Sequence, residues 1–254
     1  MKKIPALFVI LLLISYACNE SVYEPYNNNF SDFFPNSDGN YYYYNVSVLD
    51  TNGSIIQSGL KKSHYFGDTI IFSIKNQIKV DSFQLGSLQN INNSYFRKDA
   101  YGVFNSVDVD TNGFYFLLPD SLRGGISFPT QFPVILNSLE VEQKWHLFEV
   151  WVDLLQYGFR AFNVEAEIVS LDTFLIPNQS TTRFTDAYNI KYSASLITGV
   201  NQSPKLFEVH GWFAKGIGPV KWEGDSELIN FFAGAEIYPR NTNVIEELET
   251  YYLK

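Results

Sequence analysis

The stretch IIFSIKNQIKV, residues 70–80, alternates between apolar and polar side chains more clearly than any other part of the chain. One face carries the apolar residues Ile70, Phe72, Ile74, Ile78 and Val80. The other face carries Ser73, Lys75, Gln77 and Lys79. A strand that buries one face and exposes the other produces this period of two. The stretch therefore predicts a half-buried antiparallel strand over residues 70–80.

The same alternation recurs in residues 41–49, 164–168, 188–196 and 207–213. Asn52-Gly53 follows the first of these segments and predicts a hairpin turn with positive φ at both residues. Gly216-Ile217-Gly218 predicts a second hairpin rather than a phosphate-binding loop, because Pro219 after it has no N–H to offer a phosphate. Together these signals predict a mainly β fold built on a curved antiparallel sheet, either a half-barrel or an open barrel.

The C-terminal segment NVIEELETYYLK, residues 243–254, has a helical pattern. Asn243 is a suitable N-cap, Glu246 completes a capping box three residues later, and an apolar face is formed by Val244, Leu248 and Tyr251. We therefore expect one short C-terminal helix that packs on the sheet or closes one end of it.

The N-terminus determines where the protein is expected to reside. Lys2 and Lys3 precede an apolar run from Ile4 to Ile14, and small or neutral residues then lead to Cys18, which is the only cysteine in the chain. A basic start, a short apolar region and a small-residue cleavage site are typical of a signal peptide, here residues 1–17. The run is shorter than the roughly 20 apolar residues that a membrane-spanning helix needs.

The four residues SYAC, 15–18, resemble the lipobox of bacterial lipoproteins. The resemblance implies cleavage before Cys18, a covalent lipid on its thiol and attachment to a membrane, with no other cofactor. Asn19 is not the aspartate that retains many such lipoproteins in the inner membrane, so the resemblance implies the outer membrane of the cell envelope.

The remaining chain is expected to comprise a flexible tether, residues 18–32, and a single β domain, residues 33–254. The segment 123–136 contains Gly124-Gly125 and two prolines, so it either separates two domains or crosses over within one sheet; we favour the crossover. Removing residues 1–17 leaves 16 basic and 27 acidic side chains, a net charge of −11. Such a surface does not favour nucleic acid as a partner, because the binding of nucleic acid depends on clustered Lys and Arg.

No catalytic or metal-binding motif stands out. Asp108–Gly113 begins like a calcium loop, but Pro119 occupies the position that needs a bidentate glutamate, so a hairpin turn is the better interpretation and no metal site is predicted. His64, His146 and His210 form no ligand motif. A glycosidase pair remains open among six carboxylates: Glu140, Glu142, Glu149, Asp153, Glu165 and Glu167.

Three segments in order, FFPNSDGNYYYYNV, VEQKW and WFAKGIGPVKWEGDSEL, resemble a group of uncharacterised bacterial lipoproteins and periplasmic proteins. That group is similar to the curved half-barrels of periplasmic lipoprotein carriers. The resemblance implies a fold and brings no catalytic residue with it.

We expect a non-catalytic binding or assembly protein whose concave sheet face holds an apolar ligand or an envelope protein. The expected ligand-contact aromatics are Tyr42, Tyr44, Trp145, Trp151, Trp212 and Trp222. Two alternatives remain. One is a glycan-active enzyme with paired carboxylates in a tryptophan-lined cleft, and the other is a purely structural surface protein.

Overall fold

The computed structural model describes residues 32–107, 118, 126–154, 157–178, 181–199 and 202–254. The predicted signal peptide, Cys18 and the Asp108–Gly113 motif lie outside these residues. In the part of the chain that the structure describes, no helix is both long and apolar enough to cross a membrane.

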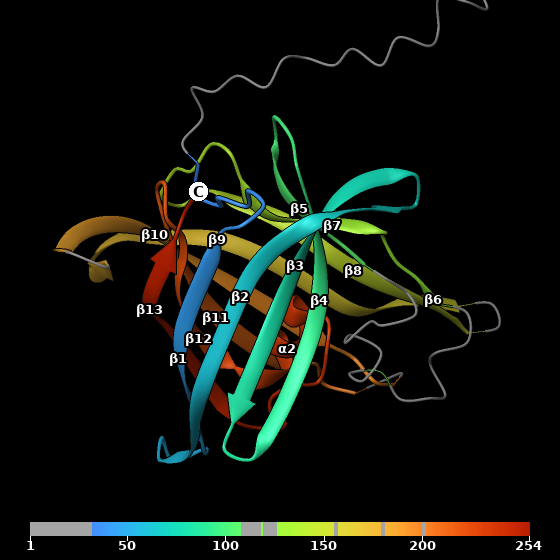
Figure 1. The fold of residues 1–254 in the computed structure, drawn as a ribbon. Coiled ribbons are helices and arrows are strands. Elements are labelled where there is room, and N and C mark those ends of the chain that lie inside the picture. Colours follow the sequence, from blue (N-terminus) through green and yellow to red (C-terminus); the bar gives the residue numbers. More distant parts are fainter. Residues whose placement is uncertain (1–31, 108–117, 119–125, 155–156, 179–180, 200–201) are drawn as a thin grey trace, which may run out of the picture.

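The described residues form one 13-stranded antiparallel sheet and one short helix (Figure 1). The strands are β1 (Tyr41–Leu49), β2 (Ile55–Ile71), β3 (Ile74–Leu85), β4 (Leu88–Lys98), β5 (Gly102–Ser106), β6 (Ile126–Ser127), β7 (Gln131–Leu136), β8 (Lys144–Leu154), β9 (Tyr157–Asn178), β10 (Thr181–Leu196), β11 (Lys205–Ala214), β12 (Gly218–Asp225) and β13 (Asn243–Tyr252), and the helix is α2 (Ser226–Ala233).

The strand order is β6-β8-β9-β10-β11-β12-β13-β1-β2-β3-β4-β5-β7, so the sheet is open, with β6 and β7 at its ends. Figure 1 shows the sheet curled on itself: β1 to β4 cross in front of β9 to β12, and α2 lies between the two layers. The predicted class, a mainly β fold with an open, curved antiparallel sheet and a single short helix, is confirmed.

The position predicted for the helix is wrong. Residues 243–252 form β13, which pairs with β12 on one side and β1 on the other. Tyr43 faces Thr250 and Tyr44 faces Leu248, so Glu249 is an extra residue that forms a bulge. The bulge changes the alternation by one position, and Val244, Leu248 and Tyr251 are therefore all buried in a strand at spacings that imitate a helix.

The single strand predicted over residues 70–80 is also wrong. β2 ends at Ile71 and β3 begins at Ile74, with Phe72 (φ 50°) and Ser73 (φ 64°) as a two-residue turn between them. Ile70 lies in the hairpin with 74% of its surface exposed. Further along β3, the buried face carries Asp81, Phe83 and Leu85, so the face predicted to be polar and exposed is the one that turns inward.

The helix α2 was not expected from the sequence. It ends at Gly234, whose left-handed conformation (φ 73°) lets its N–H reach the carbonyl of Phe231. The Asn230 side chain fixes the chain after the helix: its Oδ1 accepts from the N–H groups of Ile237 and Tyr238, and its Nδ2 donates to the carbonyl of Tyr238. Seven of the eight helical residues are buried, so no polar face marks the helix in the sequence.

The remaining strand predictions are confirmed. Residues 41–49 are β1, and the segments 164–168, 188–196 and 207–213 lie within β9, β10 and β11. The turn after β1 is a hairpin, but only Gly53 has positive φ there (80°), because the Asp50 carboxylate organises the loop by accepting from the N–H groups of Asn52 and Ser54. The β11–β12 hairpin turns at Gly216 and Gly218, with φ of 68° and 105°.

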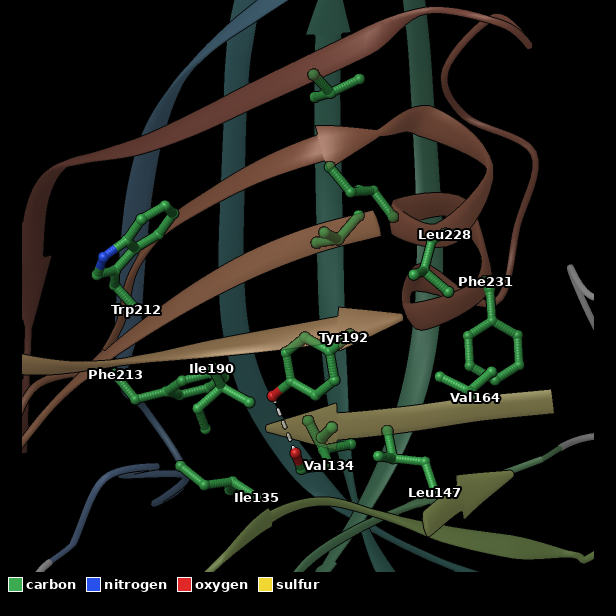
Figure 2. Packing of buried hydrophobic residues seen from close by; sticks show 14 of the residues in the cluster. Val134, Ile135, Leu147, Val164, Ile190, Tyr192, Trp212, Phe213, Leu228 and Phe231 are labelled. Atoms are coloured by element: carbon green, nitrogen blue, oxygen red, sulfur yellow. Dashed lines mark hydrogen bonds between the residues drawn. The ribbon is translucent and has the colours of Figure 1, made fainter. Parts of the chain in front are cut away.

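Side chains, rather than a strand ladder, connect the facing ends of the sheet. Within the segment 126–136, β6 pairs with β8 and β7 pairs with β5, at opposite ends of the strand order. The carbonyls of Pro133 and Val134 in β7 accept hydrogen bonds from Trp145 Nε1 (3.1 Å) and Tyr192 Oη (2.9 Å). Figure 2 shows the Tyr192 bond reaching across the core to Val134. We call this junction the β7–β8 seam.

Candidate functional site

The concave side of the sheet is occupied by α2. Phe231 packs against Phe132, Phe148 and Phe162 with ring centroids 5.1, 5.3 and 5.4 Å apart. In Figure 2, Phe231 of the helix points toward Val164 of β9. Dense packing of this kind stabilises the fold. The sites reachable from solvent therefore have to be sought on the outer surface.

Two of the six expected ligand-contact aromatics lie in the core with their hydroxyls already engaged. Tyr42 donates to the carbonyl of Pro35 (2.8 Å) and Tyr44 donates to the carbonyl of Pro219 (2.9 Å). Both side chains are at most 2% exposed. Burial raises the pKa of both phenols, so they remain neutral hydrogen-bond donors.

The four tryptophans have different surroundings. Trp145 lies at the β7–β8 seam, and Trp222 stacks on Tyr192 with ring centroids 5.6 Å apart. Trp212 is 9% exposed and donates to Asp172 Oδ2 (2.7 Å). Trp151 is 42% exposed on β8. Among the expected aromatics, Trp151 is thus the one that presents a large part of its ring to solvent.

A cluster of four charged side chains lies inside the sheet where β1, β2, β3 and β13 meet. Lys61 Nζ is 2.6 Å from Glu246 Oε2, and Lys79 Nζ is 2.8 Å from Asp81 Oδ2. The side chains of Glu246 and Asp81 are each 1% exposed, that of Lys61 is 8% exposed and that of Lys79 is 15% exposed. Two hydroxyls complete the cluster: Ser63 donates to Asp81 Oδ1 (2.5 Å) and Tyr238 donates to Glu246 Oε1 (2.6 Å).

The four charges sum to zero, and each lies beside an opposite charge, although burial lowers the pKa of Lys79 despite its contact with Asp81. Burial favours the neutral form of Asp81, but the Lys79 and Lys61 ammonium groups outweigh it and hold the pKa of Asp81 below its usual range. Burial likewise opposes the charge on Lys61, but Glu246 and Asp81 outweigh it and raise the pKa of that amine. Through these pairs and the Ser63–Asp81 hydrogen bond, the cluster connects β2, β3 and β13 inside the sheet.

An open hollow of about 400 Å³ lies on the outer surface beside Trp151. Its lining comes from β8 and from the segment at β6, and includes Ser127, Phe128, Pro129, His146, Glu149 and Trp151. We call it the Trp151 hollow. The volume falls in the range of about 300–1,000 Å³ that small-molecule sites usually have.

A β-bulge gathers the polar side chains of the Trp151 hollow. His146 faces Glu165 and Phe148 faces Val164, so Leu147 is the extra residue, and it is buried. The bulge places His146 and Glu149 on one face although they are three residues apart. Arg160 of β9 lies directly opposite Trp151 and extends this face.

The charged groups around the Trp151 hollow are only loosely paired. Glu149 Oε2 is 3.8 Å from His146 Nε2 and 4.0 Å from Arg160 Nη1, and these three side chains are 37%, 46% and 47% exposed. Neither distance is that of a direct hydrogen bond. The hydrogen-bonding capacity of the carboxylate and the guanidinium therefore remains available to a ligand seated on the indole.

A second hollow of about 690 Å³ lies on the outer face of β1 to β4. We call it the outer groove, and its lining includes Tyr43, Leu60, Lys62, Gln84, Gln89 and Ile91. Leu60 and Ile91 are 50% and 71% exposed. Lys62 Nζ lies 5.6 Å from the centre of the Tyr43 ring. The outer groove is larger and more apolar than the Trp151 hollow, and two lysines line it: Lys62 and the buried Lys61 of the charged cluster.

The other sequence candidates do not converge. Of the six carboxylates considered for a glycosidase pair, Glu149 alone lines a hollow described above. Glu167 lies within 4 Å of two lysines, Lys144 and Lys191, and Glu165 accepts from Asn163 Nδ2 (3.2 Å). Among the described residues, no three His, Cys, Asp or Glu side chains are grouped so as to hold a metal ion.

The comparisons with known proteins give two distant structural neighbours. No family model matches the chain, and no curated protein matches it either. A "putative lipoprotein" from Parabacteroides distasonis aligns over 88% of this chain and 100% of its own, with 11% identity and a TM-score of 0.44. A "putative exported protein with YmcC-like fold" from Bacteroides fragilis aligns over 88% of this chain and 99% of its own, with 14% identity and a TM-score of 0.46.

Sequence reasoning missed the buried charged cluster. Lys79 was assigned to a solvent-facing surface and Glu246 to a helix cap, and Lys61 and Asp81 carried no signal at all. Charged residues on strands normally indicate the exposed face. Strand pairing brings these groups together. β2 pairs with β3 and with β1, and β1 pairs with β13, which is far from it in the chain.

Proposed function

We propose that this chain is a lipid-anchored, non-catalytic binding protein of the bacterial cell envelope, and that the Trp151 hollow binds a sugar ring of a glycan. The observation that carries the proposal is the exposed Trp151 indole in an open hollow beside Glu149, His146 and Arg160. A pyranose has an apolar C–H face that packs on an indole and a rim of hydroxyls. Glu149 accepts from these hydroxyls, and Arg160 donates to them.

The composition of the hollow supports binding without cleavage. Hydrolysis of a glycosidic bond requires two carboxyl groups about 5–10 Å apart across the sugar. Glu149 is the one carboxylate among the residues that line the Trp151 hollow. The buried acids Asp81 and Glu246 are each 1% exposed and paired with lysines.

The anchor is the lipid on Cys18, as the SYAC sequence implies. Several acyl chains on one residue give stable membrane attachment, because each buried methylene contributes about 0.8 kcal/mol. The decisive measurement is the intact mass of protein purified from bacterial membranes, beside a Cys18→Ala variant. We expect a mature chain that begins at Cys18 with its acyl chains, and loss of both the acyl mass and membrane retention in the variant. An unmodified, freely released wild-type chain would refute the anchor.

Binding is tested by isothermal titration of the purified protein with hexasaccharides of cellulose, starch, xylan, laminarin and chitin. We expect at least one to bind, and Trp151→Ala to weaken that binding about tenfold, since an aromatic contact is worth about 0.5–1.5 kcal/mol beyond its buried area and the lost apolar area adds to this. Phe184→Ala is the matched control, because Phe184 is 76% exposed on another strand. If Trp151→Ala keeps the wild-type affinity, or if no hexasaccharide binds, the hollow is not a sugar site. If a hexasaccharide is cleaved to shorter sugars, the protein is not a non-catalytic binding protein.

A further inference from the structure

The described chain begins with a segment that covers one end of the sheet. Residues 32–39 contact three strands here: Gly39 N–H donates to the carbonyl of Tyr65 in β2, Lys98 of β4 pairs with Asp32, and the Phe33 ring lies 5.4 Å from that of Tyr188 in β10. The Gly216 N–H in the β11–β12 turn donates to the carbonyl of Asp32. We call this end of the sheet the tethered end, because the chain from Cys18 joins the body there.

Two hairpins extend past the tethered end as two-stranded ribbons. β1 begins opposite His64, so residues 66–71 of β2 pair with β3 alone. β11 ends opposite Ala187, and β8 begins opposite Glu167, so residues 171–178 of β9 and 181–186 of β10 pair only with each other. Figure 1 shows the two ribbons leaving opposite sides of the body at the end of the sheet where the C-terminus lies, whereas the β1–β2 and β3–β4 turns lie at the other end.

The ribbons carry large apolar side chains that the fold does not cover. On the first ribbon, Phe66, Ile70 and Phe72 are 66%, 74% and 49% exposed. On the second, Leu171, Leu175 and Phe184 are 49%, 58% and 76% exposed, and Leu175 faces Phe184 directly across the two strands. Tyr101, in the β4–β5 turn close to Lys98, is 78% exposed. Apolar surface of this extent usually marks an interaction site.

The turn at Phe72 gives an independent indication. Phe72 and Ser73 both have positive φ, 50° and 64°, where Asn-Gly is the favoured pair. A left-handed conformation costs a residue other than glycine about 1–2 kcal/mol. A bulky aromatic residue at the tip is therefore unfavourable for both backbone and solvation, unless its ring is covered by something outside this body.

We propose that the tethered end rests on the lipid bilayer, with the tips of both ribbons inserted at the membrane interface. The proposal rests on the lipid anchor at Cys18. Thirteen residues separate Cys18 from Asp32, and a coil of that length spans about 20 Å. Phe72 lies seven residues beyond Tyr65, which is about 23 Å along a strand. The length of the ribbon is thus comparable to the span of the tether, and Phe, Tyr, Ile and Leu are residues that enter the membrane interface.

The test uses the full lipidated chain in phosphatidylcholine vesicles, with an environment-sensitive maleimide dye on Phe72→Cys and, separately, on Phe184→Cys. The control is Leu88→Cys: Leu88 is 65% exposed, between Phe72 (49%) and Phe184 (76%), but it begins β4 at the opposite end of the sheet. We expect lipids that carry a nitroxide quencher to reduce the fluorescence at positions 72 and 184 at least threefold more than at position 88. Equal quenching at the three positions, none at all, or stronger quenching at position 88 overturns the proposal.

Labelling of the wild-type chain distinguishes a failure of the proposed lipid anchor from a failure of the proposed membrane contact. A lipid on Cys18 blocks its thiol, so the wild type should take up no dye. Labelled wild type means that the anchor itself is wrong. Unlabelled wild type with position 72 in water means that the anchor is right and the membrane contact is wrong.

Discussion

Replacing Lys61 by methionine tests whether the buried charged cluster is a structural centre of the sheet. Lys61 Nζ lies 2.6 Å from Glu246 Oε2, and the two side chains are 8% and 1% exposed. Methionine fills a similar volume but leaves the interior with one uncompensated negative charge. Breaking a buried ion pair by removing one partner typically costs about 3–5 kcal/mol. This is a large part of the roughly 5–15 kcal/mol that stabilises most domains.

The assay is urea unfolding followed by circular dichroism on detergent-solubilised protein. With an m-value of about 3 kcal/mol/M, the expected loss lowers the midpoint by about 1–1.7 M. The matched control is Lys144→Met, because Lys144 pairs with Glu167 at 3.2 Å with 69% of its side chain exposed. An exposed pair contributes at most about 1 kcal/mol, so that midpoint should move little.

A double variant completes the test. Lys61→Met with Glu246→Gln removes both charges while leaving an acceptor for the Tyr238 hydroxyl, which lies 2.6 Å from Glu246. We expect the double variant to recover at least about 1 kcal/mol relative to Lys61→Met alone, because the uncompensated charge is gone. If Lys61→Met costs no more than Lys144→Met, the cluster does not hold the sheet together and the reasoning is refuted.

Three further predictions concern the packing around α2, the turn at Phe72-Ser73 and the buried charged cluster. Phe231→Ala should lower the free energy of unfolding by about 3–5 kcal/mol, because it leaves a cavity among three aromatic rings; a loss under 1 kcal/mol in urea unfolding would contradict the packing described. Phe72→Asn should raise it by about 1 kcal/mol, because asparagine tolerates positive φ; an unchanged or lower midpoint argues against strain at the turn. Lys79 and Lys61 hold the pKa of Asp81 below 3.8, so its contribution is present above that pH and is lost as the pH falls through the folded-state value. The stability gap between wild type and Asp81→Asn should therefore narrow between pH 5 and pH 3, and a constant gap would show that folding does not shift the pKa of Asp81.

The sequence was sufficient for the fold class because alternation survives wherever a strand has one buried face. It failed where a local irregularity changes that alternation. The bulge at Glu249 gave β13 the apolar spacing of a helix. The turn at Phe72-Ser73 has neither glycine nor asparagine, so two strands appeared as one. α2 is buried on nearly all sides, so it lacks the amphipathic pattern by which helices are found.

The candidate site was predictable in part. Trp151 and Glu149 were both named from the sequence, but nothing showed that a bulge at Leu147 brings His146 to the same face, or that Arg160 lies opposite the indole. These relations depend on strand register, which a single sequence specifies weakly when both faces carry aromatic residues.

The strand order has a consequence for how the chain assembles. Among the described strands β13 comes last in the chain, yet it lies in the middle of the sheet, between β12 and β1. On either side of it, neighbouring strands are mostly hairpin partners close in sequence, so each half can begin to form while the chain is still being made. The halves are joined only when the final ten strand residues, Asn243–Tyr252, arrive. A chain cut before residue 243 would leave β1 and β12 as two long unpaired edges, which are ready templates for aggregation, so the completeness of the C-terminus controls the solubility of the whole protein.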